Sequence, residues 1–301
     1  METLKGWFEG FLGKEKREEE EEYYVEWRSM LKRFFRVRTA VIGLVIFCIY
    51  LFLAIFGNLV MPRPITETNL AVRLEAPNMK YFFGTDWLGR DLLSLCIFAC
   101  RTSILVVLIS VSFAVIGGLI IGLIAGYFGG VVDEVIMRAC DILLAFPNII
   151  LAIVVLSIAG ANLVNVCLVI AVGRIPRVAR ILRSTVMSIK SRDYILASKA
   201  LGFSSSHIMF RNILPNAIGP LTIVIAMGAA LAVKQEATLS FLGIGVPPPA
   251  IGFGYITSLG RQYFIFKPHI CLIPALGVAF LSLSFSLIAD GLRDSLDPRL
   301  R

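Results

Sequence analysis

The chain has 301 residues, of which 57% are hydrophobic and only 17% are charged. Its mean hydropathy of +0.81 excludes a soluble globular domain. Apolar segments long enough to cross about 30 Å of hydrocarbon recur along the chain, so the net charge of +8 indicates membrane topology and not nucleic-acid binding. The sequence therefore predicts an all-α polytopic membrane protein that contacts the lipid bilayer, with no nucleic acid as a partner.

The first predicted element is a cytoplasmic lead-in over residues 1–39, which are polar and charged. No short apolar core precedes a small-residue cleavage site, so the segment lacks the pattern of a signal peptide. It contains an acidic run, Glu18–Glu22, and then aromatic and basic residues that alternate over residues 23–35. This alternation favours an interfacial helix on the membrane surface, leading into a membrane domain over residues 40–301.

Six transmembrane helices fit the apolar runs, and the third is interrupted by Pro147. With the N-terminus inside, 21 of the 29 Lys and Arg residues fall on the cytoplasmic side and 8 on the outer side. The positive-inside rule then predicts that both termini and the loop around Gly202 are cytoplasmic. The six spans are expected over about residues 40–60, 103–127, 135–158, 163–182, 212–233 and 268–289.

The second predicted span carries three glycines at intervals of four residues, Gly118, Gly122 and Gly126. Glycines at this spacing lie on one helix face and let another backbone approach closely. They are therefore predicted to be helix-packing residues. The sequence leaves open whether the neighbouring helix belongs to the same chain or to another subunit.

Residues 237–260 are uncharged and rich in glycine and proline, with three consecutive prolines at Pro247–Pro249. Proline there prevents one continuous helix. The segment is predicted to be an extracytoplasmic loop that dips back toward the membrane and rests on protein. A seventh span is the alternative.

The sequence holds no recognisable catalytic set. No Gly-rich phosphate loop ends in Gly-Lys-Ser/Thr, and the two histidines, His207 and His269, lack a metal-ligand spacing. The six cysteines lie mostly in apolar runs, where cysteine packs as a small hydrophobe. The chain is therefore predicted not to be an enzyme and to bind no cofactor or metal of its own.

The acidic residues bear on how transport would be driven. Ion-coupled carriers usually keep such residues in mid-membrane, whereas Asp141, Glu236 and Asp290 lie near predicted span ends. Arg138 and Asp141 are three residues apart and are expected to pair on one helix face. The energy is therefore expected to come from another chain. A stand-alone ion-coupled carrier or channel, and a membrane-embedded enzyme, are the alternatives of other classes.

The basic stretch before the fifth span begins with arginines every three residues, where anchoring at lipid phosphates is one interpretation. These are Arg174, Arg177, Arg180 and Arg183.

A loop over about residues 190–215 follows. Asp193 is predicted to cap a short helix that runs through Leu201, and Gly202 to end it in a left-handed conformation. The serines at 204–206 then cap a second short helix toward Pro215. Two short helices at a turn make a compact knob, which suits a groove on a soluble protein.

Several motifs resemble those of ABC-importer permeases. Residues 194–202, with Ile213–Asn216, are similar to the "EAA" loop of that family. Residues 84–91, Gly-Thr-Asp-Trp-Leu-Gly-Arg-Asp, resemble a signature of the C-type subunit in the dipeptide/oligopeptide/nickel branch. The similarity covers residues 30–301, with further matches at 126–130, 143–147, 239–243, 290–294 and 296–299.

The resemblance implies a type I permease fold and a coupling loop that docks on an ATPase. The usual Glu of the loop falls at Leu196 and its second Ala at Ser198, so a salt bridge from that Glu cannot be made here. The residues implied for coupling are Tyr194, Leu196, Ala197, Ser198, Lys199, Ala200, Leu201, Gly202, Leu214 and Pro215.

The same resemblance implies partners and a cargo. The partners are a B-type permease, two ATP-binding cassette subunits that bind ATP and Mg, and an extracytoplasmic solute-binding protein. The expected location is the bacterial or archaeal cytoplasmic membrane. The expected cargo is di- or oligopeptides, with nickel, glutathione or other small solutes as alternatives within the family.

Overall fold

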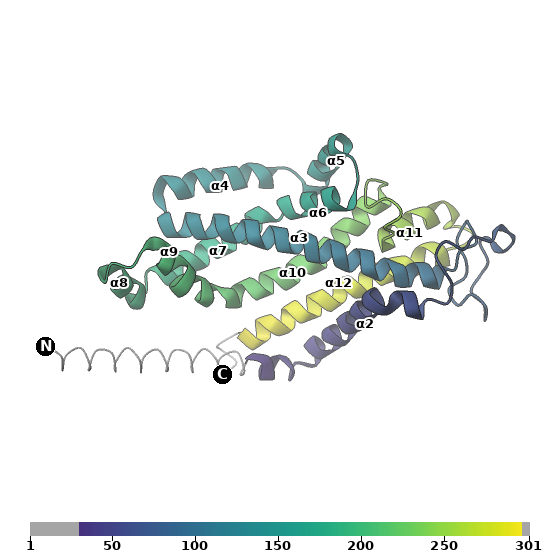
Figure 1. Ribbon diagram of the computed structural model, residues 1–301, viewed down its shortest axis with the longest axis horizontal. Coiled ribbons are helices and arrows are strands. Elements are labelled where there is room, and N and C mark those ends of the chain that lie inside the picture. Colours follow the sequence, from purple (N-terminus) through teal and green to yellow (C-terminus); the bar gives the residue numbers. More distant parts are fainter. Residues whose placement is uncertain (1–29, 297–301) are drawn as a thin grey trace.

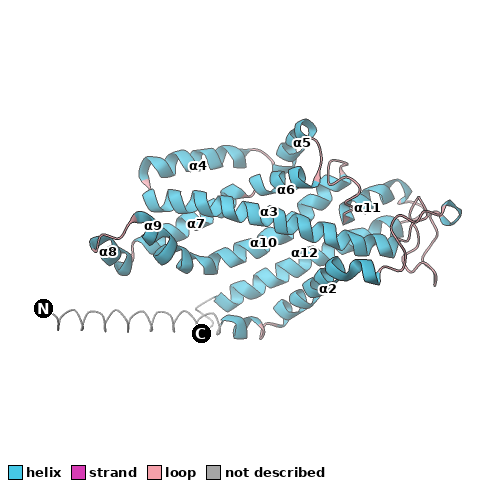
Figure 2. Ribbon diagram, in the orientation of Figure 1, coloured by secondary structure: helices cyan, strands magenta, loops and turns pink. Residues whose placement is uncertain are grey.

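The computed structural model describes residues 30–296, and this part of the chain is built of helices without a β-strand (Figures 1 and 2). The predicted acidic run and most of the predicted interfacial helix lie outside these residues. The all-α prediction is confirmed for the described part.

In chain order the elements are α2 (Arg38–Val60), η1 (Leu70–Val72), α3 (Leu92–Phe128), α4 (Gly130–Ala145), α5 (Asn148–Ala159), α6 (Leu163–Val172), α7 (Ile175–Lys190), α8 (Asp193–Ala200), α9 (Ser205–His207), η2 (Ile208–Ile213, a π-helical segment), α10 (Leu214–Phe241), α11 (Phe253–Gly260), η3 (Arg261–Tyr263) and α12 (His269–Leu296).

Four helices in the described part are long and apolar enough to cross a membrane. They are α2, α3, α12 and the continuous helix Ser205–Phe241, with mean hydropathies between 1.9 and 2.9. Helices α4 and α5 together would make a fifth crossing, although they meet at an angle of 87°. The prediction of a multi-pass membrane protein is therefore confirmed.

The second and third predicted spans need correction. Helix α3 begins at Leu92, well before the predicted residue 103, because Asp91 accepts a 2.8 Å hydrogen bond from the Ser94 N–H and caps the helix there. Arg101 interrupts the apolar run but not the helix. The third predicted span is two helices, since Phe146 is extended and Pro147 cannot donate to a helical ladder.

The fourth predicted span, residues 163–182, is wrong as one helix. Helix α6 ends at Val172 after ten residues, which is a length of about 15 Å. Gly173 and Arg174 then form a break, and α7 starts with a proline in its first turn, where the missing N–H has no helical partner to lose. Two short helices replace one long helix.

The helices form an elongated bundle around α3, which contacts α2, α6, α7 and α10. Helix α12 packs between α2 and α10. Figure 1 shows α8 and α9 toward one end of the molecule, the end where α2 starts and α12 stops. Helices α5 and α11 and the long segment after α2 lie toward the other end. The bundle therefore places the short helices α8 and α9 far from α11 and the segment after α2.

Residues 237–260 differ from the predicted loop. Their first five residues continue α10 to Phe241, and a turn with φ of +84° at Gly243 follows. Helix α11 then packs against α10 and α12. At eight residues α11 is only about 12 Å long, so the alternative of a seventh span is wrong.

The three glycines of α3 lie against α7 of the same chain. A Cβ added at Gly122 would lie 2.5 Å from the carbonyl oxygen of Ala179 and 3.0 Å from its Cα. Cβ atoms added at Gly118 and Gly126 would fall 2.5 Å and 2.8 Å from the Cβ atoms of α7 valines. The close approach of α3 and α7 therefore depends on these residues lacking a side chain.

We expect Gly122→Ala to destabilise the folded chain by about 1–3 kcal/mol, the usual cost of overpacking. The added methyl group would meet backbone atoms of α7, which cannot rotate away as a side chain does. The readout is the apparent unfolding temperature in detergent. Gly117→Ala is the matched control, because its Cβ meets the flexible end of Ile175. Equal losses in the two variants would contradict the prediction.

Candidate functional site

The knob formed by α8, α9 and the turn between them is the candidate site. Helix α8 ends in a left-handed turn at Gly202, where φ is +77°. The Gly202 N–H donates to the Lys199 carbonyl and the Phe203 N–H donates to the Ser198 carbonyl. This double pattern is the Schellman motif, which satisfies the last carbonyls of a helix. Hydrogen bonds among neighbouring residues therefore determine where α8 ends.

The start of α8 differs from the prediction. The N-cap position is Arg192, whose side chain makes no capping bond, and Asp193 is the first helical residue. Asp193 therefore does not cap the helix. Its carboxylate lies in the first turn, where the positive end of the helix dipole favours a negative charge.

The second short helix begins at a serine, as predicted. The Ser204 hydroxyl accepts a 3.3 Å hydrogen bond from the His207 N–H, and the Phe203 ring stacks on His207 with centroids 4.7 Å apart. The helix does not stop at Pro215, which sits in the first turn of α10. Helices α9, η2 and α10 are continuous. The second half of the knob is therefore part of the same helix as a candidate membrane span.

The inner side of the knob is anchored in a hydrophobic cluster. Ile195 of α8 and Ile208 and Ile213 of η2 are at most 1% exposed. They pack with Met209 of η2 and with residues from α3, α7 and α10, namely Leu123, Tyr127, Leu182, Val186, Ile189 and Ala217. The burial of these side chains holds α8 against α3, α7 and α10.

The outer side of the knob is apolar and exposed. Leu196 is 51% exposed and Leu201 is 73% exposed, with the small residues Ala197 and Ala200 also on the surface. The Lys199 ammonium lies 5.6 Å from the ring centroid of Tyr127. Apolar side chains gathered at the end of a bundle are typical of a contact with another protein.

Ser198 and Asn212 connect the two short helices. The Ser198 hydroxyl donates to the Tyr194 carbonyl at 2.8 Å and accepts from the Asn212 side-chain amide at 3.0 Å. The serine that departs from the resembled motif thus holds α8 against η2. Asn212 did not stand out in the sequence, because nothing local marks a partner fourteen residues away. Leu214 and Pro215, also implied for coupling, are half-buried at the start of α10.

We expect Ser198→Ala to loosen the knob without unfolding the bundle. Loss of one hydrogen bond of about 1 kcal/mol raises the population of an opened α8 about fivefold. Limited proteolysis within residues 190–215 measures it, with the unfolding temperature of the whole chain as reference. Ser206→Ala, at an exposed position of the same loop, is the control. The prediction fails if the two variants are cleaved at the same rate.

Three of the four arginines of the basic stretch contact protein groups. Arg180 pairs with Asp141 of α4 at 2.7 Å, and Arg183 makes a two-bond ion pair with Asp133. The predicted pair between Arg138 and Asp141 is therefore wrong. Arg174 is buried and donates to the Gly228 carbonyl of α10. These contacts tie α4 and α10 to α7.

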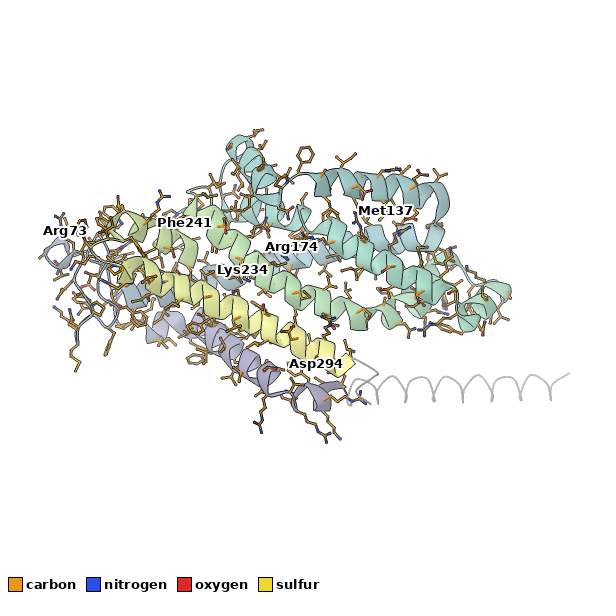
Figure 3. The ribbon with its side chains drawn as sticks, turned by 180° about the vertical axis from the view of Figure 1, so that it is seen from behind. Arg73, Met137, Arg174, Lys234, Phe241 and Asp294 are labelled. Atoms are coloured by element: carbon orange, nitrogen blue, oxygen red, sulfur yellow. The ribbon has the colours of Figure 1, made fainter. Side chains whose placement is uncertain are left out.

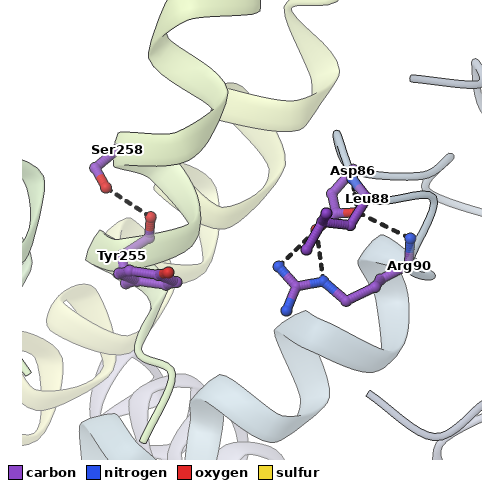
Figure 4. Close-up of polar contacts among 5 residues, drawn as sticks. All are labelled: Asp86, Leu88, Arg90, Tyr255 and Ser258. Carbon is purple, nitrogen blue, oxygen red and sulfur yellow. Dashed lines mark hydrogen bonds and ion pairs between the residues drawn. The ribbon is translucent and has the colours of Figure 1, made fainter. Parts of the chain in front are cut away.

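At the opposite end, residues 84–91 build a compact cap before α3. Asp86 is 2% exposed, and one of its oxygens accepts from the Leu88 and Arg90 N–H groups at 2.9 and 2.8 Å (Figure 4). The other oxygen accepts from the Arg90 guanidinium at 2.8 Å. The buried Thr85 hydroxyl donates to the Val72 carbonyl. The motif therefore orders the long segment between α2 and α3, a role that the sequence motif alone does not reveal.

The architecture is that of a multi-pass helical membrane protein with an anchored apolar knob at one end. Residues 118–301 match the family model of the binding-protein-dependent transport system inner membrane component. Residues 26–77 match the N-terminal transmembrane domain of oligopeptide transport permease C. The chain belongs to the family of binding-protein-dependent transport system inner membrane components, whose members are generally non-catalytic subunits.

Individual relatives agree with the family match. The chain is 37% identical to the dipeptide transport system permease protein DppC of Alkalihalophilus pseudofirmus, over 91% of this chain and 90% of that protein. It is 41% identical to the DppC of Haemophilus influenzae, over 88% and 92%. A solved structure of the inward-facing MetNI methionine ABC transporter matches with a TM-score of 0.56 and 21% identity, over 68% of this chain and 98% of that chain. This last likeness shows the fold alone.

Proposed function

We propose that this chain is one of two membrane subunits of an ATP-driven importer that moves di- or oligopeptides into the cell. The observation that carries the proposal is the knob, apolar outside and continuous with α10. It would dock in a groove of a cytoplasmic ATPase subunit through Leu196, Ala197, Ala200 and Leu201. Tyr194, Ser198, Lys199 and Gly202 would shape that contact.

The proposed mechanism is alternating access. Two partner ATPase subunits bind ATP and Mg and close on each other, and the docked knob moves with them. Because α9, η2 and α10 are one continuous helix, the movement reaches the membrane-crossing part directly. Nucleotide then biases an equilibrium between two arrangements of the spans, and hydrolysis resets it. The chain itself binds no nucleotide and catalyses no reaction.

The proposed topology has six crossings and both termini in the cytoplasm. Helices α4 with α5, and α6 with α7, would each supply one broken crossing, in addition to the four long helices. The knob, the start of α2 and the end of α12 lie toward the same end of the molecule (Figure 1). The positive-inside rule assigns that end to the cytoplasm. The membrane would be the bacterial or archaeal cytoplasmic membrane.

The partners are a B-type permease, the two ATPase subunits and an extracytoplasmic solute-binding protein. Peptide cargo is supported by the relatives that are named dipeptide permeases. Nickel, glutathione or another small solute remains the alternative, because a separate solute-binding protein would make the first selection of cargo.

The test is affinity purification of this chain from detergent-solubilised native membranes, with co-purifying chains identified by mass. Recovery of a second permease and an ATPase, and ATP-dependent uptake of dialanine after reconstitution with the binding protein, is the expected result. Transport by the lone chain without ATP would instead establish a stand-alone carrier. ATP-driven uptake of another solute, with no competition by dialanine, would replace the peptide cargo.

A further inference from the structure

A buried arginine lies in the middle of the bundle. Arg174 occupies the break between α6 and α7 and is 9% exposed. Its Nη1 donates to the Gly228 carbonyl, while its buried Nε has no partner. Figure 3 shows Arg174 in the middle part of the molecule, away from Arg73 and Phe241 toward one end. Arg174 is one of five residues in the described part with a buried side-chain polar atom that has no partner, and it is the only arginine or lysine among them. A buried donor of this kind calls for a ligand or a functional explanation.

The depth of Arg174 excludes a lipid phosphate as its partner. Arg174 follows the ten-residue helix α6, which is about 15 Å long. It therefore lies about 15 Å from the start of α6 at Leu163, which is half of a hydrocarbon layer of about 30 Å. Gly228, which it contacts, is near the middle of the 28-residue helix α10. An ionised side chain at this depth is costly and usually marks a functional site.

Arg174 lines a pocket of about 170 Å³ between the middle parts of α3 and α10 and the first half of α7. The pocket is mostly apolar, and its charged residues are Arg174 and Arg177, with no carboxylate in the lining. Three of its wall residues, Ile181, Met227 and Leu231, are 39–55% exposed, so the pocket opens at the surface of this subunit. A solute can therefore reach the guanidinium from outside the chain.

No acidic residue in the described part of the chain neutralises this charge. The nearby carboxylates of α4, Asp133 and Asp141, are already paired with Arg183 and Arg180. Glu236 lies two turns beyond Gly228 on α10 and accepts from the Ser240 hydroxyl at 2.8 Å. The pocket therefore holds excess positive charge in surroundings of low dielectric constant, where an anion gains the most from binding.

We propose that this pocket binds a carboxylate of the transported solute at the midpoint of its passage, with Arg174 as the main contact and Arg177 as a second cation. The proposal rests on the proposed importer function and names the group of the cargo that the membrane subunit recognises. A volume of about 170 Å³ is below the roughly 300–1,000 Å³ of pockets that enclose whole ligands. The site therefore holds one end of a peptide, and the C-terminal carboxylate fits its charge.

The first test is dialanine uptake by the complete importer in proteoliposomes at saturating binding protein. Arg174→Met is expected to lower uptake at least about tenfold, with partial recovery in Arg174→Lys, which keeps the charge. Arg177→Met, which preserves the contact between Arg174 and Gly228, is expected to lower uptake by a smaller factor. Arg101→Met is the matched control, because it removes the same charge from an exposed position on α3 and is expected to leave uptake unchanged.

The second test measures the electrostatic preference of the pocket without a transport assay. In the assembled importer carrying Met227→Cys, the rates of modification by an anionic sulfonatoethyl and a cationic trimethylammonioethyl thiosulfonate are measured at residue 227 by mass spectrometry. We expect the anionic reagent to react several-fold faster, and Arg174→Met to abolish the preference. Dialanine is expected to slow the anionic reagent more than alanyl-alaninamide does, because only the dipeptide has a free carboxylate.

The outcomes separate the two proposals. If the unmodified importer does not take up dialanine, the peptide function is wrong. If it does, but Arg174→Met and Arg177→Met import as fast as Arg101→Met, the carboxylate site is wrong. Loss of uptake in Arg174→Met with no charge preference at residue 227 would assign Arg174 a purely structural bond to α10 and would also overturn the site.

Discussion

Gly202→Asp is expected to lower ATP-driven uptake at least about 30-fold while the chain still accumulates in the membrane. Gly202 is exposed in the knob, and a Cβ there would meet nothing within 4 Å. Aspartate is one of the few residues that adopts a positive φ such as the +77° found here, so the strain stays within the turn and the bundle is expected to fold. In the docked state, however, the carboxylate would be buried against an apolar surface beside Leu201. An unpaired charge buried in an interface costs about 2–5 kcal/mol, and each 1.4 kcal/mol is tenfold in affinity.

Gly202→Asn is the matched control for this prediction. Asparagine has the shape of aspartate and also tolerates the positive φ of +77° at this turn, but it carries no charge. Uptake is measured in proteoliposomes, and co-purification of the ATPase subunits reports docking. We expect the asparagine variant to lose far less uptake than the aspartate variant. Normal uptake in Gly202→Asp would show that the knob is not the coupling surface.

Arg90→Met is expected to destabilise the segment over residues 61–91 by about 3 kcal/mol, the lower end of the range for breaking a buried ion pair. The Arg90 and Asp86 side chains are 13% and 3% exposed, and their ion-pair distance is 2.7 Å. Removing the guanidinium leaves a buried carboxylate that keeps only two backbone donors. Because Asp91 caps α3 directly after this turn, the start of α3 should fray as well.

Protease cleavage within residues 61–91 and the apparent unfolding temperature in detergent measure this effect. Arg73→Met is the control, since Arg73 is an exposed arginine of the same segment. The double variant Asp86→Asn/Arg90→Met is expected to recover most of the loss, because a neutral amide oxygen still accepts from the two N–H groups. If Arg90→Met is no more sensitive than Arg73→Met, the ion pair does not order this segment.

The sequence predicted the starts of the first and last helices closely, although α12 continues to Leu296, beyond the predicted end at 289. Helices α2 and α12 start within two residues of the predicted positions, because each begins at a clear change from polar or proline-containing sequence to a long apolar run. The third and fourth spans were less predictable. Pro147 was recognised as an interruption, but an angle of 87° between α4 and α5 depends on how each half packs. The break at Gly173 had no strong local signal.

In the candidate site, too, some features were predictable from local sequence and others were not. The left-handed turn at Gly202 and the cap at Ser204 follow from neighbouring residues, so local rules predicted them. The assignment of the cap of α8 to Asp193 was wrong by one position, which local rules cannot resolve. The buried anchor at Ile195 and the bond from Asn212 to Ser198 require α8 and η2 to be brought together first.

The sequence by itself determined the class of this protein, its helical content and the turn that shapes the knob. These properties depend on composition and on contacts within a few residues. Only the tertiary structure decided which charges meet. Asp141 pairs with Arg180, 39 positions away, and not with Arg138, and Arg174 reaches a carbonyl 54 positions away. Such partners depend on how whole helices pack, because residues this far apart in the chain meet only when their helices lie side by side.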